Sequence, residues 1–374
     1  MKIVRQQFSV PFEYPVWFGR DVFGKESDVF EQFLNPGRRQ VKKVLVFVDD
    51  GVALADSGIL KKIETCFTSR PDVFSLVMPP QVVAGGEVSK RGWGQIQKTM
   101  TMIGNCHLCR QSYVVAVGGG SMLDGTGFAA ALVHRGIRLV RVPTSVLAQN
   151  DAGVGVKNGM DEHNMKNFVG TFAPPFAVLN DFDFLRTLPD KYWFGGIAEA
   201  VKVAIIKDRT FFDEIAAAAP KLKRRDEQAI ERIVMRCAEL HLEHIRSGGD
   251  PFEMGSARPL DFGHWAAHKL EIKSGYTLGH GQAVAIGIAL DCRYARNKGL
   301  ISSAECDAVL RTLEGCGLPI ASPDLDESVL AGLEEFREHL GGELCITLPK
   351  GIGGKVEVHE MDLPVLRELI RCAS

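Results

Sequence analysis

The run VVAVGGGSMLDGT occupies residues 114–126. A valine-rich segment, typical of a buried strand, leads into three glycines, a serine and the start of an expected helix. Glycines let the backbone approach a ligand closely, and the free N–H groups that begin a helix attract phosphate. The spacing differs from the GxGxxG of dinucleotide-binding domains, so on its own the run is typical of a tight turn between strand and helix.

The first half of the chain repeats this pattern of short β-branched runs followed by helical stretches. We expect strands at residues 41–48, 74–78, 113–117 and 139–142. Strands that alternate with helices predict a parallel sheet with βαβ crossovers. The sequence therefore predicts a Rossmann-like α/β domain, which we place at residues 1–182.

Small and polar residues follow each of these strands. Asp49 ends the first, Gly85, Gly86 and Glu87 with Lys90 follow the second, and Thr144 with Ser145 follows the fourth. Ligands of open α/β sheets bind beyond the carboxyl ends of the strands, where all of these residues are expected to meet. Together with the three glycines, they favour a nicotinamide dinucleotide over a plain turn.

From about residue 183 the pattern changes to helical periodicity. Residues 197–206, 227–245, 263–270 and 282–296 each show the 3.6-residue spacing of an amphipathic or buried helix. The second domain, residues 183–374, is therefore expected to be mainly α-helical.

One carboxylate and three histidines lie on these expected helices. Glu199 precedes Lys202 by three residues, His264 and His268 are four residues apart and share a helical face, and His280 begins another helix. Each alone is better explained as a packed or capping residue. Together they predict a divalent-metal site, and the nitrogen ligands favour zinc.

A polar, glycine-rich loop connects the two halves. Asp151 and Lys157 lie within it, followed by Lys166 and Asn167, and Arg135 precedes it. Cationic and amide groups of this kind suit a phosphate or a polyol, although a solvated loop explains each residue taken singly.

Composition excludes several classes of protein. The chain has 374 residues with 44 Lys and Arg against 46 Asp and Glu, a net charge of −2, which argues against nucleic acid or a polybasic membrane surface as partner. No apolar run reaches the ~18 residues of a membrane span. The N-terminus lacks the apolar core of a signal peptide, and nine scattered cysteines are typical of reduced thiols, so we expect a cytoplasmic protein.

The order and spacing of these motifs resemble the dehydroquinate synthases and the wider sugar phosphate cyclase superfamily. The resemblance rests on the glycine run and its continuation through DAGVGVK, on KNFVGTF, DFLRTLP, GIAEAVK, the FGHxxxH block and HGxAVAIG, and it covers residues 44–374. It implies a nucleotide-binding domain followed by a helical metal-binding domain, NAD, zinc with cobalt as an alternative, a phosphate-releasing lyase activity and a homodimer.

The resemblance also assigns residues. The implied metal ligands are Glu199, His264 and His280. The implied catalytic residues are Asp151, Lys157, Lys202 and His268. The implied substrate-binding residues are Arg135 from a neighbouring subunit, Asn167, His241, Arg258, Asp261 and His339. The implied cofactor-binding residues are Asp49, Glu87, Lys90, Gly118, Gly119, Gly120, Ser121, Asp124, Thr144, Ser145, Lys166 and Thr187.

The chain departs from dehydroquinate synthases at the residues that recognise the substrate. His241 stands where they carry a lysine, Asp261 where they carry an asparagine, Arg258 is displaced by one position, and residues 336–339 (FREH) replace a lysine pair. Loss of positive charge and gain of a carboxylate disfavour a substrate carboxylate. These departures look closer to sedoheptulose 7-phosphate cyclases of the valiolone synthase type, and the retained His268 favours 2-epi-valiolone over 2-epi-5-epi-valiolone.

Three other functions stay open at this point. A dehydroquinate synthase with an altered pocket would act on a seven-carbon keto acid phosphate. A metal-dependent polyol dehydrogenase would build up NADH, whereas a cyclase regenerates NAD. A binding protein without activity is the fourth possibility, and Gln282, where the family usually has glutamate, is one residue that keeps it open.

Overall fold

The computed structural model describes residues 2–34, 40–163, 165–255, 258–339 and 342–373. Its first half holds a seven-stranded sheet with the order β1-β9-β6-β5-β2-β3, in which β4 also pairs with β2 and every pairing is parallel. The strands are β1 (Val16–Gly19), β2 (Lys42–Asp49), β3 (Phe74–Leu76), β4 (Gln81–Val83), β5 (Tyr113–Gly118), β6 (Arg138–Pro143) and β9 (Ala177–Asp181).

Helices cover both faces of this sheet, because successive residues of its central strands point to opposite sides. On one face, Val44 and Val115 pack with α1 (Val29–Leu34) and α3 (Ile59–Thr68). On the other, Leu45 and Val114 pack with α4 (Trp93–Asn105) and α5 (Gly120–Leu132). This half also contains the short α-helix α2 (Asp50–Ala55) and four helical turns: η1 (Glu87–Lys90), η2 (Val133–Arg135), η3 (Ala148–Ala152) and η4 (Phe182–Thr187).

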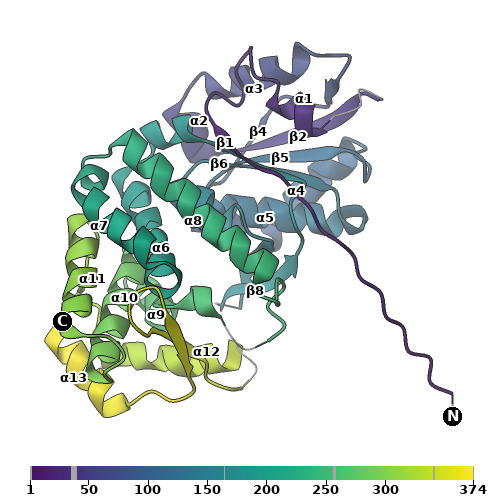
Figure 1. Ribbon diagram of the computed structural model, residues 1–374. Helices are drawn as coiled ribbons and strands as arrows, with labels where there is room; N and C mark the ends of the chain where they lie inside the picture. The colour runs from purple at the N-terminus through teal and green to yellow at the C-terminus, as the bar shows by residue number, and fades with distance from the viewer. Residues whose placement is uncertain (1, 35–39, 164, 256–257, 340–341, 374) are drawn as a thin grey trace.

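The second half is mainly helical and lies beside the sheet domain, green to yellow in Figure 1. Its helices are α6 (Asp190–Lys207), α7 (Arg209–Lys223), α8 (Glu227–Ser247), α9 (His264–Lys273), α10 (His280–Asn297), α11 (Ser303–Gly315), α12 (Ala331–His339) and α13 (Leu363–Ala373). Two 3₁₀ turns, η5 (Pro259–Asp261) and η6 (Glu327–Leu330), and the hairpin of β10 (Ile346–Pro349) with β11 (Lys355–Val358) complete it. Within the described ranges, no helix combines the length and apolar character needed to cross a membrane.

The expected fold class, a parallel-sheet domain followed by a helical domain, is confirmed. Each expected strand and helix is found with bounds that differ by three residues or fewer, except that α6 begins at Asp190, seven residues before its expected start. The sequence missed β1, β4 and β9, which have five residues or fewer, and the antiparallel hairpin of β7 (Lys157–Glu162) and β8 (Met165–Phe172). The division at residues 182 and 183 stays a prediction.

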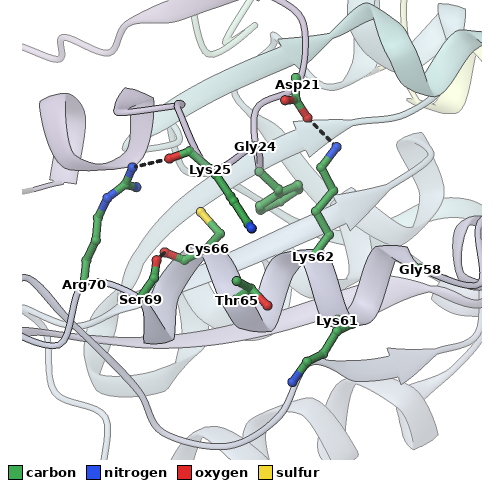
Figure 2. A pocket seen from close by; sticks show the side chains of 11 residues that line it. Asp21, Gly24, Lys25, Gly58, Lys61, Lys62, Thr65, Cys66, Ser69 and Arg70 are labelled. Atoms are coloured by element: carbon green, nitrogen blue, oxygen red, sulfur yellow. Dashed lines mark hydrogen bonds and ion pairs between the residues drawn. The ribbon is translucent and has the colours of Figure 1, made fainter.

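A hollow of about 560 Å³ lies along α3 on the outer face of the sheet domain (Figure 2). Four basic side chains line it, and three of them are paired: Lys61 with Glu64, Lys62 with Asp21, and Arg70 with backbone carbonyls. No residue predicted for the functional site lines this hollow. Its charges are largely compensated locally, and the chemistry of the molecule lies elsewhere.

Candidate functional site

Three helices of the second half bring Glu199, His264 and His280 together. Glu199 lies in the middle of α6, and the two histidines are the first residues of α9 and α10. One potential ligand atom from each residue lies within 4.8 Å of the other two. The Glu199 Oε1 atom is 3.7 Å from His264 Nε2 and 3.6 Å from His280 Nε2. These separations are too long for hydrogen bonds and suit two nitrogens and an oxygen that surround one cation.

Direct backbone contact between α6 and α10 sets the position of two of these residues. A Cβ atom on Gly281 would lie 1.9 Å from the carbonyl oxygen of Gly195, so no side chain fits at position 281. Gly195 lies about one turn before Glu199, and Gly281 directly follows His280. The absence of a side chain at Gly281 therefore holds the carboxylate and the imidazole at ligand distance from each other.

A second close backbone contact positions His264, the third candidate ligand. A Cβ atom on Gly287 would lie 2.0 Å from the carbonyl oxygen of Gly263, which precedes His264. The buried carboxylate of Asp291 accepts hydrogen bonds from the Gly263 N–H at 3.1 Å and from the Trp265 indole at 2.9 Å. Asp291 on α10 thus fixes the residues on both sides of His264.

Burial raises the pKa of Asp291 to about 7, although its two hydrogen-bond donors act to lower it. Aspartate in an unfolded chain titrates near pH ~3.9, so the unfolded state loses this proton first. This group should therefore make the protein less stable as pH rises from about 4 to about 7. We expect Asp291→Asn to reduce the difference in melting temperature between about pH 5 and about pH 8, measured by circular dichroism. An unchanged difference would contradict this assignment.

The electrostatics around Glu199 favour a charged carboxylate. Its two oxygens are buried and receive no hydrogen bond from the described residues, while the Lys202 ammonium pairs with Oε2. Burial acts to raise the pKa of Glu199, but Lys202 and the two histidines lower it to about 2. A buried anion with an unbonded oxygen beside two imidazoles is the donor set that a divalent cation requires.

His280 contacts a second carboxylate through the ring nitrogen that does not face Glu199. Its Nδ1 atom lies 3.2 Å from the Oε2 of Glu271, which ends a line of His264, His268 and Glu271 on one face of α9. Burial acts to lower the pKa of His280, but Glu271 and Glu199 raise it to about 10. A position that holds a proton so strongly also attracts a metal cation. His268 lies beside both imidazoles, and burial with His264 lowers its pKa to about 3, so it is neutral.

At the carboxyl end of the sheet, Asp49 and two glycines form a close-packed loop. The Asp49 carboxylate accepts a hydrogen bond from the Gly51 N–H at 2.8 Å. A Cβ atom on Gly85 would lie 2.2 Å from that carboxylate, and one on Gly118 would lie 2.9 Å from the Asp49 Cβ. Side chains are therefore excluded where a dinucleotide would approach the backbone.

The next residues along the glycine run begin α5. Gly119 is the N-cap of this helix and provides no side-chain cap, so the first N–H groups of α5 remain available to a phosphate. The Ser121 hydroxyl, one residue into the helix, bonds to Glu87 at 2.6 Å. Thr144 and Ser145 follow β6 at the same edge, where the Thr144 N–H donates to the Gly118 carbonyl.

Five predicted cofactor and substrate residues form one ionic network beside this edge. The Lys90 ammonium donates to the Asn167 side chain at 2.7 Å and lies 3.6 Å from Asp124. Lys166 lies 3.6 Å from Glu87. Burial raises the pKa of Asp124, whereas Lys90 and Lys166 lower that of Glu87 against the effect of burial. The network links the hairpin of β7 and β8 to the glycine run.

The predicted catalytic residues Asp151, Lys157 and Lys202 lie where η3 and the start of β7 in the first half meet the second half. Asp151 is 2.7 Å from the Nδ1 of His241 on α8 and 3.9 Å from the Lys202 ammonium. Burial acts to raise the pKa of Asp151, but Lys202 and His241 hold it below the ordinary range. Lys157, at the start of β7, pairs with Glu253 at 2.6 Å.

Asp261 and Arg258 lie close to Lys157 and its partner Glu253. Asp261 ends the turn η5, three residues before His264, and Arg258 pairs with Glu253 at 3.1 Å. Burial acts to raise the pKa of Asp261, but Lys157 and His264 lower it, so this carboxylate is charged. Asp261 is therefore an additional anion beside Lys157.

Three predicted residues are not brought into this cluster. Arg135 is exposed and lies beyond the C-terminal end of α5. The glycine run is at the N-terminal end of this helix, which has 13 residues and is therefore about 20 Å long. Thr187 is exposed at the end of η4. His339 ends α12, and its side chain lies outside the described part of the structure.

The sequence reasoning missed four buried or paired groups that organise the site: Glu271, Glu253, Arg141 and Asp291. Arg141 on β6 is fully buried and donates to the carbonyls of Gly153, Gly155 and Lys157 at 3.1, 2.9 and 2.8 Å. These bonds fix the loop that carries Asp151 and Lys157. Glu271 could have been found, because it follows His268 by three residues on the same helical face. No sequence pattern predicts the hydrogen bonds between Arg141 and the carbonyl groups of the loop.

Comparison with known proteins agrees with this geometry. Residues 81–194 match the 3-dehydroquinate synthase N-terminal family, and residues 196–335 match the 3-dehydroquinate synthase C-terminal family. The 3-dehydroquinate synthase of Syntrophotalea carbinolica is 33% identical over 356 residues, 94% of each chain. That of Shewanella sp. (strain MR-4) is 30% identical over 363 residues, 96% of each chain. The chain belongs to the dehydroquinate synthase family.

Solved structures place this dehydroquinate synthase-like chain in the sugar phosphate cyclase superfamily. ValA, a 2-epi-5-epi-valiolone synthase from Streptomyces hygroscopicus, has NAD+ and Zn2+ bound; it is 26% identical, covers 99% of each chain and has a TM-score of 0.88. A 2-deoxy-scyllo-inosose synthase complexed with carbaglucose-6-phosphate, NAD+ and Co2+ shares the fold, with 22% identity over 96% of each chain and a TM-score of 0.78. The expected cofactors of the family, NAD and a divalent metal, are confirmed.

Proposed function

We propose that this sugar phosphate cyclase converts sedoheptulose 7-phosphate into a valiolone-type cyclitol, 2-epi-valiolone, and releases phosphate. The observation that carries the proposal is the charged carboxylate of Asp261 beside Lys157 and the candidate metal ligands. A substrate carboxylate at this place would be repelled, whereas a hydroxymethyl group could donate a hydrogen bond to Asp261.

The other charged groups of the pocket support this choice. Arg258 and Lys157 both pair with Glu253, and Asp151 compensates Lys202 together with Glu199. Little positive charge is left for a substrate that carries both a phosphate and a carboxylate. His241 supplies a shorter, weakly basic side chain where dehydroquinate synthases carry a lysine.

The residues have separable roles in the proposed reaction. When bound, NAD accepts and later returns a hydride, and the metal polarises the hydroxyl oxygen that is oxidised. Lys157, Asn167 and Lys202 hold the phosphate, with Arg135 of a second subunit. Once the ring hydroxyl is oxidised to a ketone, the phosphate takes the proton of the neighbouring acidified C–H and leaves by β-elimination. Asp151 orients Lys202 and His241. After the ketone is reduced again, the hemiketal ring opens to a carbonyl and an enol, and these two groups close the new carbocycle by aldol addition.

The metal-binding and NAD-binding residues proposed from the sequence fit these groups. Glu199, His264 and His280 would hold the metal, since their ligand atoms already converge around one point. Asp49, Gly118 to Gly120, Lys90 and Lys166 would hold NAD, at an edge where side chains are excluded. Thr144, Ser145 and Thr187 are also proposed to bind NAD. Lys157, Asn167, Lys202 and Arg135 are proposed to bind the phosphate of the substrate.

The choice of 2-epi-valiolone rests on His268. Its neutral imidazole lies beside His264 and His280 and can bond to a ring hydroxyl without adding charge. The 2-epi-5-epi-valiolone branch tends to lack this histidine, although ValA, a structural neighbour, is a 2-epi-5-epi-valiolone synthase. The stereochemistry of the product decides between the two.

The second candidate is a 3-dehydroquinate synthase, which is the name of relatives 30% and 33% identical to this chain. We expect purified protein with Zn2+ and NAD to release inorganic phosphate from sedoheptulose 7-phosphate and to form a cyclitol identifiable by NMR. Phosphate release from the seven-carbon keto acid phosphate alone would overturn the proposal in favour of the second candidate. Net accumulation of NADH absorbance would instead indicate a polyol dehydrogenase.

We also infer a homodimer and a cytoplasmic location. Arg135 can contribute to a phosphate site only in a second copy, because α5 separates it from the pocket of its own chain. Size-exclusion chromatography with light scattering tests the dimer.

A further inference from the structure

Glu271 lies at the junction between the two halves of the proposed site. Its side chain is 2% exposed and bonds in two directions. Oε2 lies 3.2 Å from the Nδ1 of His280, and Oε1 accepts a hydrogen bond from the Lys166 ammonium at 2.8 Å. His280 belongs to the candidate metal site of the helical half, and Lys166 belongs to β8 of the sheet domain.

The contacts continue from Lys166 to the glycine run. Lys166 lies 3.6 Å from Glu87, and Glu87 accepts a hydrogen bond from Ser121 at 2.6 Å. Ser121 is in the first turn of α5, where a dinucleotide phosphate would bind. A continuous line of charged hydrogen-bonding groups therefore joins the candidate cofactor edge to a candidate metal ligand, and Glu271 is its central member.

We infer that Glu271 is a positioning residue that orients His280 toward the metal and couples metal binding to NAD binding. The inference rests on the proposed roles of His280 and Lys166. When a metal replaces the proton on Nε2, a hydrogen bond from Nδ1–H to Glu271 keeps the remaining proton on Nδ1 and leaves the Nε2 lone pair to the metal, on the side where Glu199 Oε1 lies 3.6 Å away. Outer carboxylates of this kind fix the orientation of histidine ligands and raise their basicity.

The shared carboxylate gives the coupling a definite sign. When Lys166 also contacts an anionic dinucleotide, it compensates less of the Glu271 charge, and more of that charge acts on His280. NAD should therefore strengthen metal binding. By thermodynamic reciprocity, the metal should strengthen NAD binding by the same factor.

The test measures Zn2+ affinity of the metal-stripped protein by competition with a chromophoric chelator, with and without NAD. For the wild-type chain we expect NAD to tighten Zn2+ binding about fivefold or more, within the usual range of coupling between sites. Glu271→Gln should weaken Zn2+ binding by about 10–100-fold, and NAD should no longer change it. Glu271→Gln should also alter the visible absorption of the Co2+-loaded protein, which a change in overall stability alone would not do.

Two further variants separate the parts of the inference. Lys166→Met removes the cation that compensates Glu271, so it should tighten Zn2+ binding in the absence of NAD, and NAD should then have no further effect. Glu335→Gln removes an exposed carboxylate that pairs with Lys269 of α9, and it should match the wild type in every measurement.

Each failure is distinguishable from failure of the proposed function. Wild-type Zn2+ affinity and Co2+ absorption in Glu271→Gln would overturn the role of Glu271 and leave the metal site standing. Coupling that persists in Lys166→Met would overturn the route through Lys166. A wild-type chain that binds no Zn2+ would overturn both this inference and the metal site itself.

Discussion

Glu199→Gln is expected to abolish stoichiometric metal binding and to lower the rate of phosphate release at least about 1,000-fold. The carboxylate is the central anion of the cluster, because Oε1 faces both imidazoles and Oε2 pairs with Lys202. An amide keeps the shape but supplies a weaker, neutral ligand. Metal polarisation of a substrate oxygen stabilises a transition state by several kcal/mol, and ~1.4 kcal/mol corresponds to a tenfold change in rate.

Metal content after dialysis and phosphate release should be measured on the same preparations. Glu239→Gln is the matched control, since Glu239 lies on the exposed surface of α8 and pairs only with Arg236 among the residues described. The control should keep both metal and activity. A Glu199→Gln protein that retains a full equivalent of Zn2+ and wild-type turnover would exclude this carboxylate as a ligand.

Glu199 and its neighbours illustrate what a sequence pattern can predict. The helical spacing of Glu199 and Lys202, and of His264 and His268, predicts shared faces because a helix brings residues three and four apart together. The same periodicity and the alternation of strands with helices predict the sheet and the helical half, since apolar spacing follows from which face is buried. The chemistry of one carboxylate and three histidines predicts a shared metal site, and the resemblance to a family assigns Glu199, His264 and His280 as its ligands.

Contacts between distant segments could not be predicted in this way. The backbone contact between Gly195 and Gly281 depends on how two helices cross, and the bonds of Arg141 depend on a loop that returns beneath β6. The pairing of Lys157 with Glu253 joins residues almost a hundred positions apart. Such contacts are set by packing, and local sequence carries no signal of them.

Asp261→Asn is expected to shift substrate preference away from sedoheptulose 7-phosphate. The variant restores the residue type that dehydroquinate synthases carry at this position and removes a charge 3 residues before His264. A hydrogen bond to a charged group stabilises by ~1.5–3 kcal/mol, so kcat/KM for sedoheptulose 7-phosphate should fall about 10–100-fold. Turnover of the seven-carbon keto acid phosphate should rise, because the carboxylate that repels it is gone.

The comparison needs kcat/KM for both substrates in wild type, Asp261→Asn and Asp261→Asn combined with His241→Lys. His241 Nδ1 lies 2.7 Å from Asp151, and His241→Lys therefore adds a cation there for the keto acid carboxylate. Because both residues are proposed to contact one substrate, their effects are expected to be non-additive. Asp307→Asn, an exposed change on α11, serves as the control. If Asp261→Asn leaves the ratio of the two kcat/KM values unchanged, Asp261 does not select the substrate, and the proposed preference for a hydroxymethyl group loses its physical basis.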